Sequence, residues 1–291
     1  MLDSKIETFI NVIKYKSYTL AAEKLHMTQP AVTQHIHKLE SYYGCLLIDS
    51  SRHTVKPTQA GMLLYEYLRL QKANEERFSH LLHNAVEPLC VGATLSIADY
   101  YLPDLLADYM LSGSGRIRVT VGNTASLLDM LQRGTLDCAF IEGLFNTTML
   151  ETRVFQNAPF LPVVSQNHPL IEATLPMLHK FPLVLREPHS GTREILENWL
   201  HQENDAPQAF SHVVELGSFV LIKEFVKRSD AVTFVYEGVV RRELKTGELR
   251  ALSLKNFSLT HPLLFVFRKG DPRRSHLMEF FDAFRAADTK K

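Results

Sequence analysis

The sequence predicts an α/β protein that begins with a small helical domain carrying a β-wing, continues into one long helix and ends in a larger α/β half. Three observations lead to this prediction. In residues 1–45 the apolar side chains recur at helical spacing. A helical pattern then follows Pro57 without a break. From Pro88 onward, apolar runs of strand length alternate with helices, which is typical of parallel sheets.

Length and composition agree with a folded protein of two or three domains. The chain has 291 residues, of which 45% are hydrophobic and 22% charged, and one domain takes roughly 100–200 residues. Disorder is excluded, and no apolar run approaches the roughly 18–20 residues of a membrane span. The opening MLDSKIETF has no apolar core, so we expect no signal peptide. Three scattered cysteines (Cys45, Cys90 and Cys138) indicate neither a disulfide framework nor a zinc site and are typical of the cytoplasm.

The net charge does not indicate a nucleic-acid partner. The whole chain has 32 basic and 32 acidic residues. Residues 1–88 hold ten Lys or Arg and nine Asp or Glu, a net charge of +1. A strong electrostatic attraction to DNA is therefore absent, and any prediction of DNA binding depends on the residue pattern.

The helical domain is predicted to contain three helices and a wing. Thr19 is expected to cap a helix over 20–25, and Thr28 a third helix that ends at Gly44. Pro30 falls in the first turn of that third helix, where its missing N–H costs nothing. Two short strand-like runs, at 45–48 and 54–56, flank a turn and predict the wing.

A long helix is predicted from Thr58, its N-cap, to about residue 84. An apolar stripe on so long a helix does not stay exposed, and the small wing domain cannot cover all of it. We therefore expect the helix to pair with a second copy of the chain. The apolar residues expected on it are Leu64, Tyr65, Leu68, Phe78, Leu81 and Leu82.

The C-terminal half is predicted to alternate strands and helices. The chain is expected to cross between two similar α/β halves near 158–161 and again near 260–264. The expected strands are 89–92, 117–121, 138–141, 161–164, 183–185, 212–216, 232–236 and 263–268. The expected helices are 102–110, 127–133, 193–202, 220–227 and 275–286.

The N-terminal residues resemble the winged helix-turn-helix of LysR-type transcriptional regulators. The opening Thr58-x-Ala60-Gly61 of the long helix also matches, whereas Leu47-Ile48-Asp49-Ser50 departs from the usual Leu-Phe-x-Arg. The residues that carry the match are Ala21, Ala22, Leu25, Thr28, Gln29, Pro30, Ala31, Ile36, Leu39 and Glu40.

The resemblance covers the whole chain and implies its organisation. It implies a winged helix-turn-helix domain over 1–58, a linker and dimerisation helix over 59–87, and an effector-binding domain over 88–291. That last domain would have two periplasmic-binding-protein-like lobes, lobe I at about 88–160 and 264–291 and lobe II at about 161–263. The implied partners are a double-stranded DNA operator, further copies in a dimer or tetramer, RNA polymerase and a small-molecule effector, with no cofactor and no membrane.

Segments of the effector half resemble one branch of the family, the regulators of carbon fixation and of sulfur assimilation. These segments are Val91–Thr94, Gly122–Thr124 and Leu185–Arg193. One position departs from that pattern, because the family more often has glycine where this chain has His189.

The third helix carries the side chains that can read DNA. Short and amide side chains near the start of a helix can reach base edges in the major groove. Lysine, arginine and hydroxyl groups nearby can contact phosphate, and a histidine there would make affinity depend on pH. The predicted base-contacting residues are Thr28, Gln29, Pro30, Thr33, Gln34 and His37. The predicted phosphate-side residues are Lys38, Arg52, His53, Lys56 and Thr58, with His35 nearby.

Hydroxyl groups follow several of the predicted strands of the effector half. Ligands of open α/β folds bind at the carboxyl ends of strands, where helix N-termini favour anions. Arg193 adds a positive charge, so we expect an anionic effector; the alternative is that these hydroxyls only cap helices. The predicted effector-binding residues are Thr94, Ser96, Asn123, Thr124, Ser190, Thr192, Arg193 and Ser218.

Other functions have weaker support in the sequence. No HExxH, GxSxG, P-loop or GxGxxG motif occurs, so we do not expect an enzyme. A solute-binding module without DNA contact would need a signal peptide. A metal sensor would draw on the 13 histidines, but these are scattered along the chain.

Overall fold

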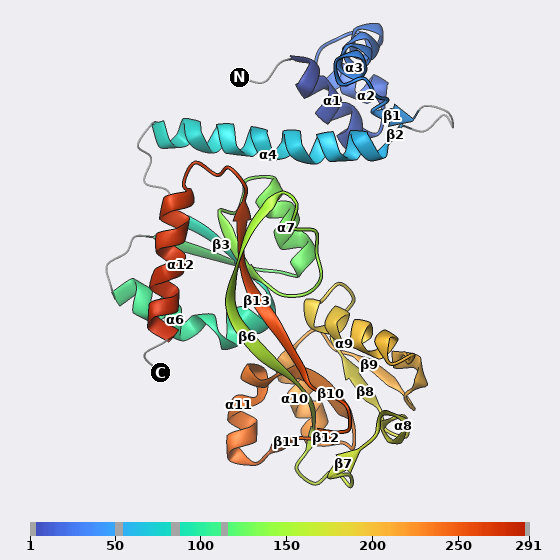
Figure 1. Cartoon of the computed structure of the whole chain (residues 1–291), viewed down its shortest axis with the longest axis vertical. Helices are drawn as coiled ribbons and strands as arrows, with labels where there is room; N and C mark the ends of the chain where they lie inside the picture. Colours follow the sequence, from blue (N-terminus) through green and yellow to red (C-terminus); the bar gives the residue numbers. More distant parts are fainter. Residues whose placement is uncertain (1–3, 50–54, 83–87, 112–115, 289–291) are drawn as a thin grey trace. The chain divides into compact units, whose positions relative to one another are not determined.

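The computed structural model describes residues 4–49, 55–82, 88–111 and 116–288. It divides into two compact units. The first contains the helical domain and the long helix, together with the short segments 132–135 and 268–272, and the second contains the remainder of the α/β half. The ribbon in Figure 1 is coloured along the chain, and each unit is described here by itself.

The first unit has the predicted order of helices and wing strands. Helix α3 (Gln29–Tyr43) packs against α1 and α2 over a shared apolar core, to which α4 contributes Leu68. The core includes Phe9, Val12, Val32, Ile36, Leu39 and Leu47. The other elements are α1 (Ser4–Tyr15), α2 (Tyr18–Lys24), β1 (Ile48–Asp49), β2 (Lys56–Pro57) and α4 (Gln59–Leu82).

The caps of these helices agree with the sequence at Thr28, Gly44 and Thr58 and differ at one position. Thr28 caps α3, and Gly44 ends it in the left-handed region at φ +67°. The N-cap of α2 is Ser17 and not Thr19, because Ser17 has an extended backbone and its Oγ accepts the Leu20 N–H at 3.2 Å. The wing strands are also shorter than predicted, at two residues each.

The second unit contains one mixed sheet of nine strands, in which parallel strands of the predicted kind are joined by antiparallel ones. Its order is β4-β3-β5-β13-β6-β10-β8-β9, with β11 paired to β6. Strands β4, β3 and β5 are parallel, as are β10, β8 and β9, whereas β13 is antiparallel to β5 and β6 antiparallel to β10. The main strands are β3 (Leu89–Ala93), β4 (Ile117–Val121), β5 (Cys138–Ile141), β6 (Leu150–Ser165), β8 (Leu183–Leu185), β9 (Val213–Glu215), β10 (Val232–Tyr236), β11 (Leu249–Ala251) and β13 (Leu259–Arg268).

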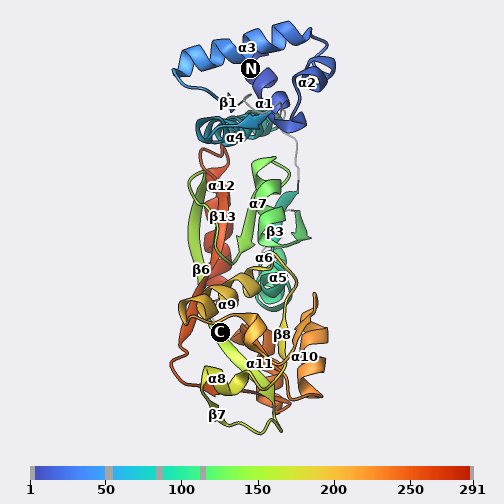
Figure 2. The ribbon, with the colours of Figure 1, turned by 90° about the vertical axis from the view of Figure 1, so that its right-hand side faces the viewer.

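Two long strands join two α/β lobes into the predicted fold. Figures 1 and 2 show β6 and β13 side by side along both lobes. Strand β6 has 16 residues where the sequence predicted only 161–164, because the continuous strand includes the crossing between lobes. Lobe I contains β3, β4 and β5, and lobe II contains β8, β9 and β10. A separate pair, β7 (Glu172–Ala173) and β12 (Ser253–Leu254), completes the strands of the described residues.

The helices of this unit include several that periodicity did not reveal. The unpredicted α5 (Leu95–Tyr100) and α8 (Leu175–Leu178) are short, and α11 (Glu237–Thr246) is strongly polar on one face. A short 3₁₀ turn occupies Pro207–Ala209. The predicted helices are α6 (Leu102–Leu111), α7 (Thr124–Gln132), α9 (Gly191–Gln202), α10 (Phe219–Lys227) and α12 (Arg274–Asp288). Among the described residues no helix is long and apolar enough to cross a membrane.

Candidate functional site

Helix α3 has one buried face and one exposed polar face. Val32, Ile36 and Leu39 are buried in the helical core. The predicted base-contacting residues Gln29, Pro30, Gln34 and His37 are exposed, as is Lys38. Thr33 is half-buried, and its Oγ1 donates to the Gln29 carbonyl at 3.1 Å. The helix therefore presents an amide, an imidazole and an ammonium group on one accessible face, with a second exposed amide, that of Gln29, in its first turn.

Two threonines predicted to contact DNA serve as helix caps. Thr28 Oγ1 accepts the Ala31 N–H at 3.4 Å. Thr58 Oγ1 accepts the Gly61 N–H at 3.0 Å and donates its proton to the Leu46 carbonyl at 2.7 Å. A hydroxyl has a single proton, so Thr58 cannot donate to a phosphate without losing the bond to Leu46. Of the other phosphate-side residues, Lys56 is exposed on β2, and Arg52 and His53 lie outside the described residues.

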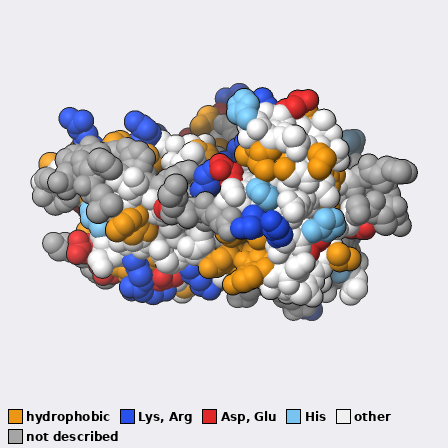
Figure 3. All heavy atoms as spheres, turned by 90° about the horizontal axis from the view of Figure 1, so that it is seen from above, with side chains coloured by type: hydrophobic (Ala, Val, Ile, Leu, Met, Phe, Trp, Pro, Cys, Tyr) orange, Lys and Arg blue, Asp and Glu red, His pale blue; other side chains and the backbone are white. Residues whose placement is uncertain are grey.

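The histidines of α3 face in different directions. His35 is half-buried, and its Nδ1 lies 2.8 Å from Thr8 Oγ1 of α1, so it contacts the core instead of the expected phosphate surface. His37 is exposed, with its Nδ1 3.4 Å from a carboxylate oxygen of Glu40. Figure 3 shows Lys, Arg and His side chains scattered among uncharged ones, as the balanced composition implies.

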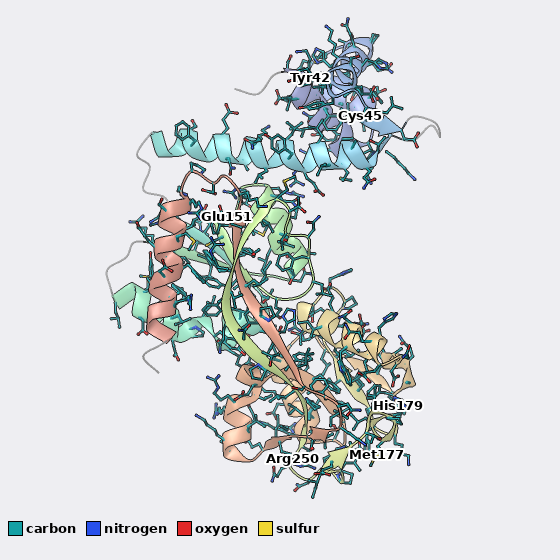
Figure 4. The ribbon with its side chains drawn as sticks, in the orientation of Figure 1. Tyr42, Cys45, Glu151, Met177, His179 and Arg250 are labelled. Carbon is teal, nitrogen blue, oxygen red and sulfur yellow. The ribbon has the colours of Figure 1, made fainter. Side chains whose placement is uncertain are left out.

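Glu40 has a structural role that the sequence did not reveal. Its Oε1 accepts the backbone N–H groups of Leu47 at 2.9 Å and Ile48 at 3.3 Å. Gly61 approaches the same turn so closely that a Cβ would lie 1.9 Å from the Leu47 carbonyl oxygen. Both positions belong to the family pattern, and both fix the chain between α3 and the wing. Figure 4 labels Tyr42 and Cys45 at this end of α3.

The exposed apolar stripe of α4 differs from the predicted one. Leu68 is only 3% exposed, and Tyr65 packs beside it against the helical core. Leu63 and Tyr67 are instead exposed at 55% and 46%, and Phe78, which was predicted, is exposed at 52%. The prediction that Tyr65 and Leu68 face a partner was wrong, because these residues form part of the chain's own core. The side chains of Leu81 and Leu82 lie outside the described residues.

The main feature of the α/β unit is Glu142, a buried carboxylate at the end of β5. Ser96 Oγ of α5 donates to this carboxylate, and Thr192 Oγ1 of α9 donates to its Oε1 at 3.1 Å. Thr124 Oγ1 of α7 donates to the Glu142 backbone carbonyl at 2.7 Å. Three of the predicted effector-binding residues, from three helices and both lobes, therefore meet at one acidic residue.

The lobes are in close contact at Glu142. A Cβ on Gly191, the first residue of α9, would lie 2.7 Å from Glu142 Cγ. Gly143 follows in the left-handed region at φ +99°, and a Cβ there would lie 3.0 Å from the Gly191 Cα. Two glycines thus allow the end of β5 and the start of α9 to approach each other.

Burial raises the pKa of Glu142 above its ordinary value. Desolvation of the charged form is the largest effect. Hydrogen bonds from Ser96 and Thr192 and the positive charge of Arg186 act in the opposite direction. The Thr94 hydroxyl also lowers this pKa, although it is buried and forms no well-directed hydrogen bond among the described residues.

Arg186 and two tyrosines complete the surroundings of Glu142. Arg186 is bound by Glu187 through two contacts of 2.7 Å, and its guanidinium lies 4.4 Å from the centre of the Phe219 ring. Tyr101 packs against the start of α11, and burial raises its pKa to about 12. Tyr236 is also buried, and its hydroxyl lies 3.4 Å from His261 Nδ1.

The remaining predicted effector residues are not joined to Glu142 by any described hydrogen bond. Asn123 Oδ1 accepts the Ser126 N–H at 2.8 Å at the start of α7. Ser190 and Ser218 occupy the N-cap positions of α9 and α10 but make no capping side-chain bond, so simple capping does not account for them.

Arg193, which was predicted to add a positive charge to the effector site, is paired with acidic side chains. Its Nε contacts Glu197 at 2.7 Å, and its Nη1 contacts Glu215 at 2.8 Å and the Arg186 carbonyl at 3.3 Å. Its charge is therefore balanced by two acids. His189, where the family more often has glycine, lies in the left-handed region at φ +66°, which explains the family's preference.

Sequence reasoning missed Glu142, Arg186, Tyr101 and Tyr236. Its search followed hydroxyls at strand ends, whereas Glu142 is an acid directly after a fully buried strand. Among the described residues, no group of three or more His, Cys, Asp or Glu side chains could hold a metal ion. His179, labelled in Figure 4, instead contacts Asp205 at 2.7 Å.

A winged helix-turn-helix followed by a two-lobed α/β domain defines a ligand-responsive DNA-binding regulator. Residues 4–62 match the bacterial regulatory helix-turn-helix protein, lysR family, and residues 84–289 match the LysR substrate binding domain. The chain belongs to the family of LysR-type transcriptional regulators and is a DNA-binding regulator with an effector-binding domain.

Individual relatives agree with this family. The regulator CysL of Bacillus subtilis is 30% identical over 90% of this chain and 89% of its own. A RuBisCO operon transcriptional regulator of Allochromatium vinosum is 26% identical over 91% of this chain and 89% of its own. Full-length LysG of Corynebacterium glutamicum with bound effector Arg shares the fold, with a TM-score of 0.66, 18% identity and coverage of 100% and 99% of the two chains.

Proposed function

We propose that this regulator binds its operator by placing α3 in the major groove. The observation that carries the proposal is the exposed surface of α3, where Gln34 lies opposite the buried ridge of Val32, Ile36 and Leu39 and Gln29 is exposed in the first turn. Glutamine can bind adenine through two hydrogen bonds. The test is binding of the full chain to DNA upstream of its own gene, comparing wild type with Gln34→Ala. Gln202→Ala, an exposed glutamine of α9, is the matched control.

We also propose that α4 forms a homodimer through its exposed stripe. Leu63 and Tyr67 lie one helical turn apart, and Phe78 lies further along the helix. A two-fold pair would present two copies of α3 to a palindromic site. Sedimentation of the Leu63→Glu variant tests this pairing.

A tetramer needs a second self-association surface, and the effector domain offers one. Strand β4 is an edge of the sheet, and its Val121 is 50% exposed. Helix α10 exposes Val220 at 63% and Leu221 at 56%. An apolar sheet edge and an apolar helix face are features that self-association commonly covers. We propose that these two surfaces assemble dimers into the tetramer implied by the family.

The effector is proposed to bind between the lobes at Glu142. Ser96 and Thr192 reach this carboxylate from lobe I and lobe II, so a ligand there would contact both lobes and bias their closure. Calorimetry on wild type and Thr192→Val tests the location. One candidate class of effector is a small anion. The observation that favours it is the N-terminus of α9, where Ser190 makes no capping side-chain bond.

The remaining proposals follow from the family. A regulator of this kind acts where its operator DNA lies, so we propose the cytoplasm as its location. We propose contact with RNA polymerase at the promoter and no catalytic reaction. Promoter-driven transcription in vitro, with and without the protein, tests the contact with polymerase.

A further inference from the structure

The protons of three hydroxyls around Glu142 are already committed. Ser96 donates its proton to the Glu142 carboxylate, and Thr192 donates to the same group at 3.1 Å. Thr124 donates to the Glu142 carbonyl at 2.7 Å. A hydroxyl carries one proton and two acceptor lone pairs. These three side chains therefore offer acceptors, not donors, to a molecule that enters between the lobes.

The cations near this point are also committed. Arg186, whose charge acts on Glu142, holds Glu187 through two contacts of 2.7 Å. Arg193 is bound by Glu197 and Glu215 at 2.7 and 2.8 Å. An anion would thus meet a carboxylate, hydroxyl lone pairs and two neutralised guanidinium groups.

We infer that Glu142 determines the class of effector and selects a small organic cation with an ammonium or guanidinium group. This inference rests on the proposed effector site between the lobes. Such a group donates several hydrogen bonds and carries a positive charge that balances the negative charge of the buried carboxylate. A small anion could bind here only if the Glu142 side chain moved away. Among the described hydroxyls at the carboxylate, only that of Thr94 has a proton that is not already donated in a hydrogen bond.

Opening of the lobes must accompany binding. Glu142 is fully buried, and Gly191 approaches it too closely to admit even a Cβ. When the lobes part, the bond from Thr192 breaks, and the cation takes its place at the carboxylate. Glu142 thus holds the lobes together when they are closed and binds the effector when they part.

The test is calorimetry on the full chain with agmatine, putrescine and L-arginine as cationic probes, and sulfate, phosphate and citrate as anionic probes. We expect the wild type to bind at least one cationic probe and none of the anions. Glu142→Gln should weaken the cation by about 30-fold, which is about 2 kcal/mol at 1.4 kcal/mol per tenfold. Glu279→Gln, an exposed acid of α12, should leave it unchanged.

Ser96→Ala provides a second variant that retains the carboxylate. A cation should bind this variant at least as tightly as wild type, whereas an anion held by the Ser96 hydroxyl would bind more weakly. Equal cation affinity in wild type and Glu142→Gln would overturn the inference, as would the absence of binding by every cationic probe. Anion binding that Ser96→Ala and Thr192→Val weaken would also overturn it but would leave the interlobe site intact. If Glu142→Gln, Ser96→Ala and Thr192→Val all left ligand binding unchanged, the proposed site between the lobes would be refuted.

Discussion

Thr192 at the start of α9 donates a hydrogen bond of 3.1 Å to Glu142 at the end of β5. This bond joins a hydroxyl of lobe II to a carboxylate of lobe I. Both groups are buried, so water cannot take the place of either hydrogen-bond partner while the lobes are closed. The bond therefore links the position of the lobes to the charge and hydrogen-bonding state of one residue.

Replacing Thr192 with valine tests this link through stability. The variant keeps the shape of the side chain but leaves Glu142 without its lobe II donor. Loss of a partner for a buried polar group costs about 1–3 kcal/mol, so the free energy of unfolding should fall by that amount. Urea unfolding followed by circular dichroism measures it. The control Thr260→Val, at an exposed position of β13, should change stability by less than about 0.5 kcal/mol. If Thr192→Val and Thr260→Val lowered the free energy of unfolding equally, the hydrogen bond between Thr192 and Glu142 would not stabilise the closed lobes.

The stability of the effector domain should depend on pH through Glu142. Burial raises its pKa above the ordinary 4.5, so between that value and the raised pKa the folded protein holds a proton that the unfolded chain has lost. The free energy of unfolding contributed by this group therefore falls as pH rises from 4.5 through the raised pKa. Glu142→Gln removes this loss, so the variant should gain stability relative to wild type as pH rises above 4.5 and through the raised pKa of Glu142.

The groups that face Glu142 do not obscure that measurement. Burial raises the pKa of Tyr101 to about 12 and that of Tyr236 well above its ordinary value. Burial lowers the pKa of His261, beside Tyr236, but this histidine is present in both proteins. A constant difference in melting temperature between wild type and Glu142→Gln across the pH range would show that Glu142 does not titrate there.

The α4 stripe should control dimer formation. Leu63→Glu and Tyr67→Glu place charge on the exposed stripe, so they should weaken self-association and operator affinity without unfolding the domain. Leu68→Ala removes part of the helical core and should instead lower stability by about 2–5 kcal/mol. Analytical ultracentrifugation and thermal melting separate the two effects. A Leu63→Glu protein that sediments as wild type would exclude this stripe from the dimer.

The second surface should control the step from dimer to tetramer. Val220→Glu and Leu221→Glu on α10 are expected to give dimers that still bind a single palindromic site. Lys245→Glu at the end of α11, away from the apolar face, is the control. Light scattering coupled to size-exclusion chromatography reports the masses. A tetramer that survives both α10 substitutions would remove α10 from the interface.

The sequence was informative where local pattern dominates. The five-residue strand β4 and the buried strands β5, β8 and β10 have the predicted bounds, and Thr28 and Gly44 delimit α3 as expected. These features depend on turn chemistry and on apolar runs, which are local.

The predictions that failed depend on long-range packing. Tyr65 and Leu68 have the periodicity of an exposed stripe, but the helical core covers them. The sequence also did not reveal that Arg193 is paired with Glu197 and Glu215. Glu142 was missed because its significance comes from Ser96 and Thr192, which are 46 and 50 residues away along the chain.

Operator recognition by α3 is the central claim, and DNase I footprinting on the chain's own upstream DNA tests it most directly. We predict a protected two-fold symmetric site for wild type and for Gln202→Ala. Gln29→Ala should lose about 1–3 kcal/mol of discrimination at one base pair per half-site, whereas Lys38→Ala should weaken binding evenly and reduce the salt dependence by about one unit of slope. An identical footprint and affinity for wild type, Gln29→Ala and Gln34→Ala would contradict the account.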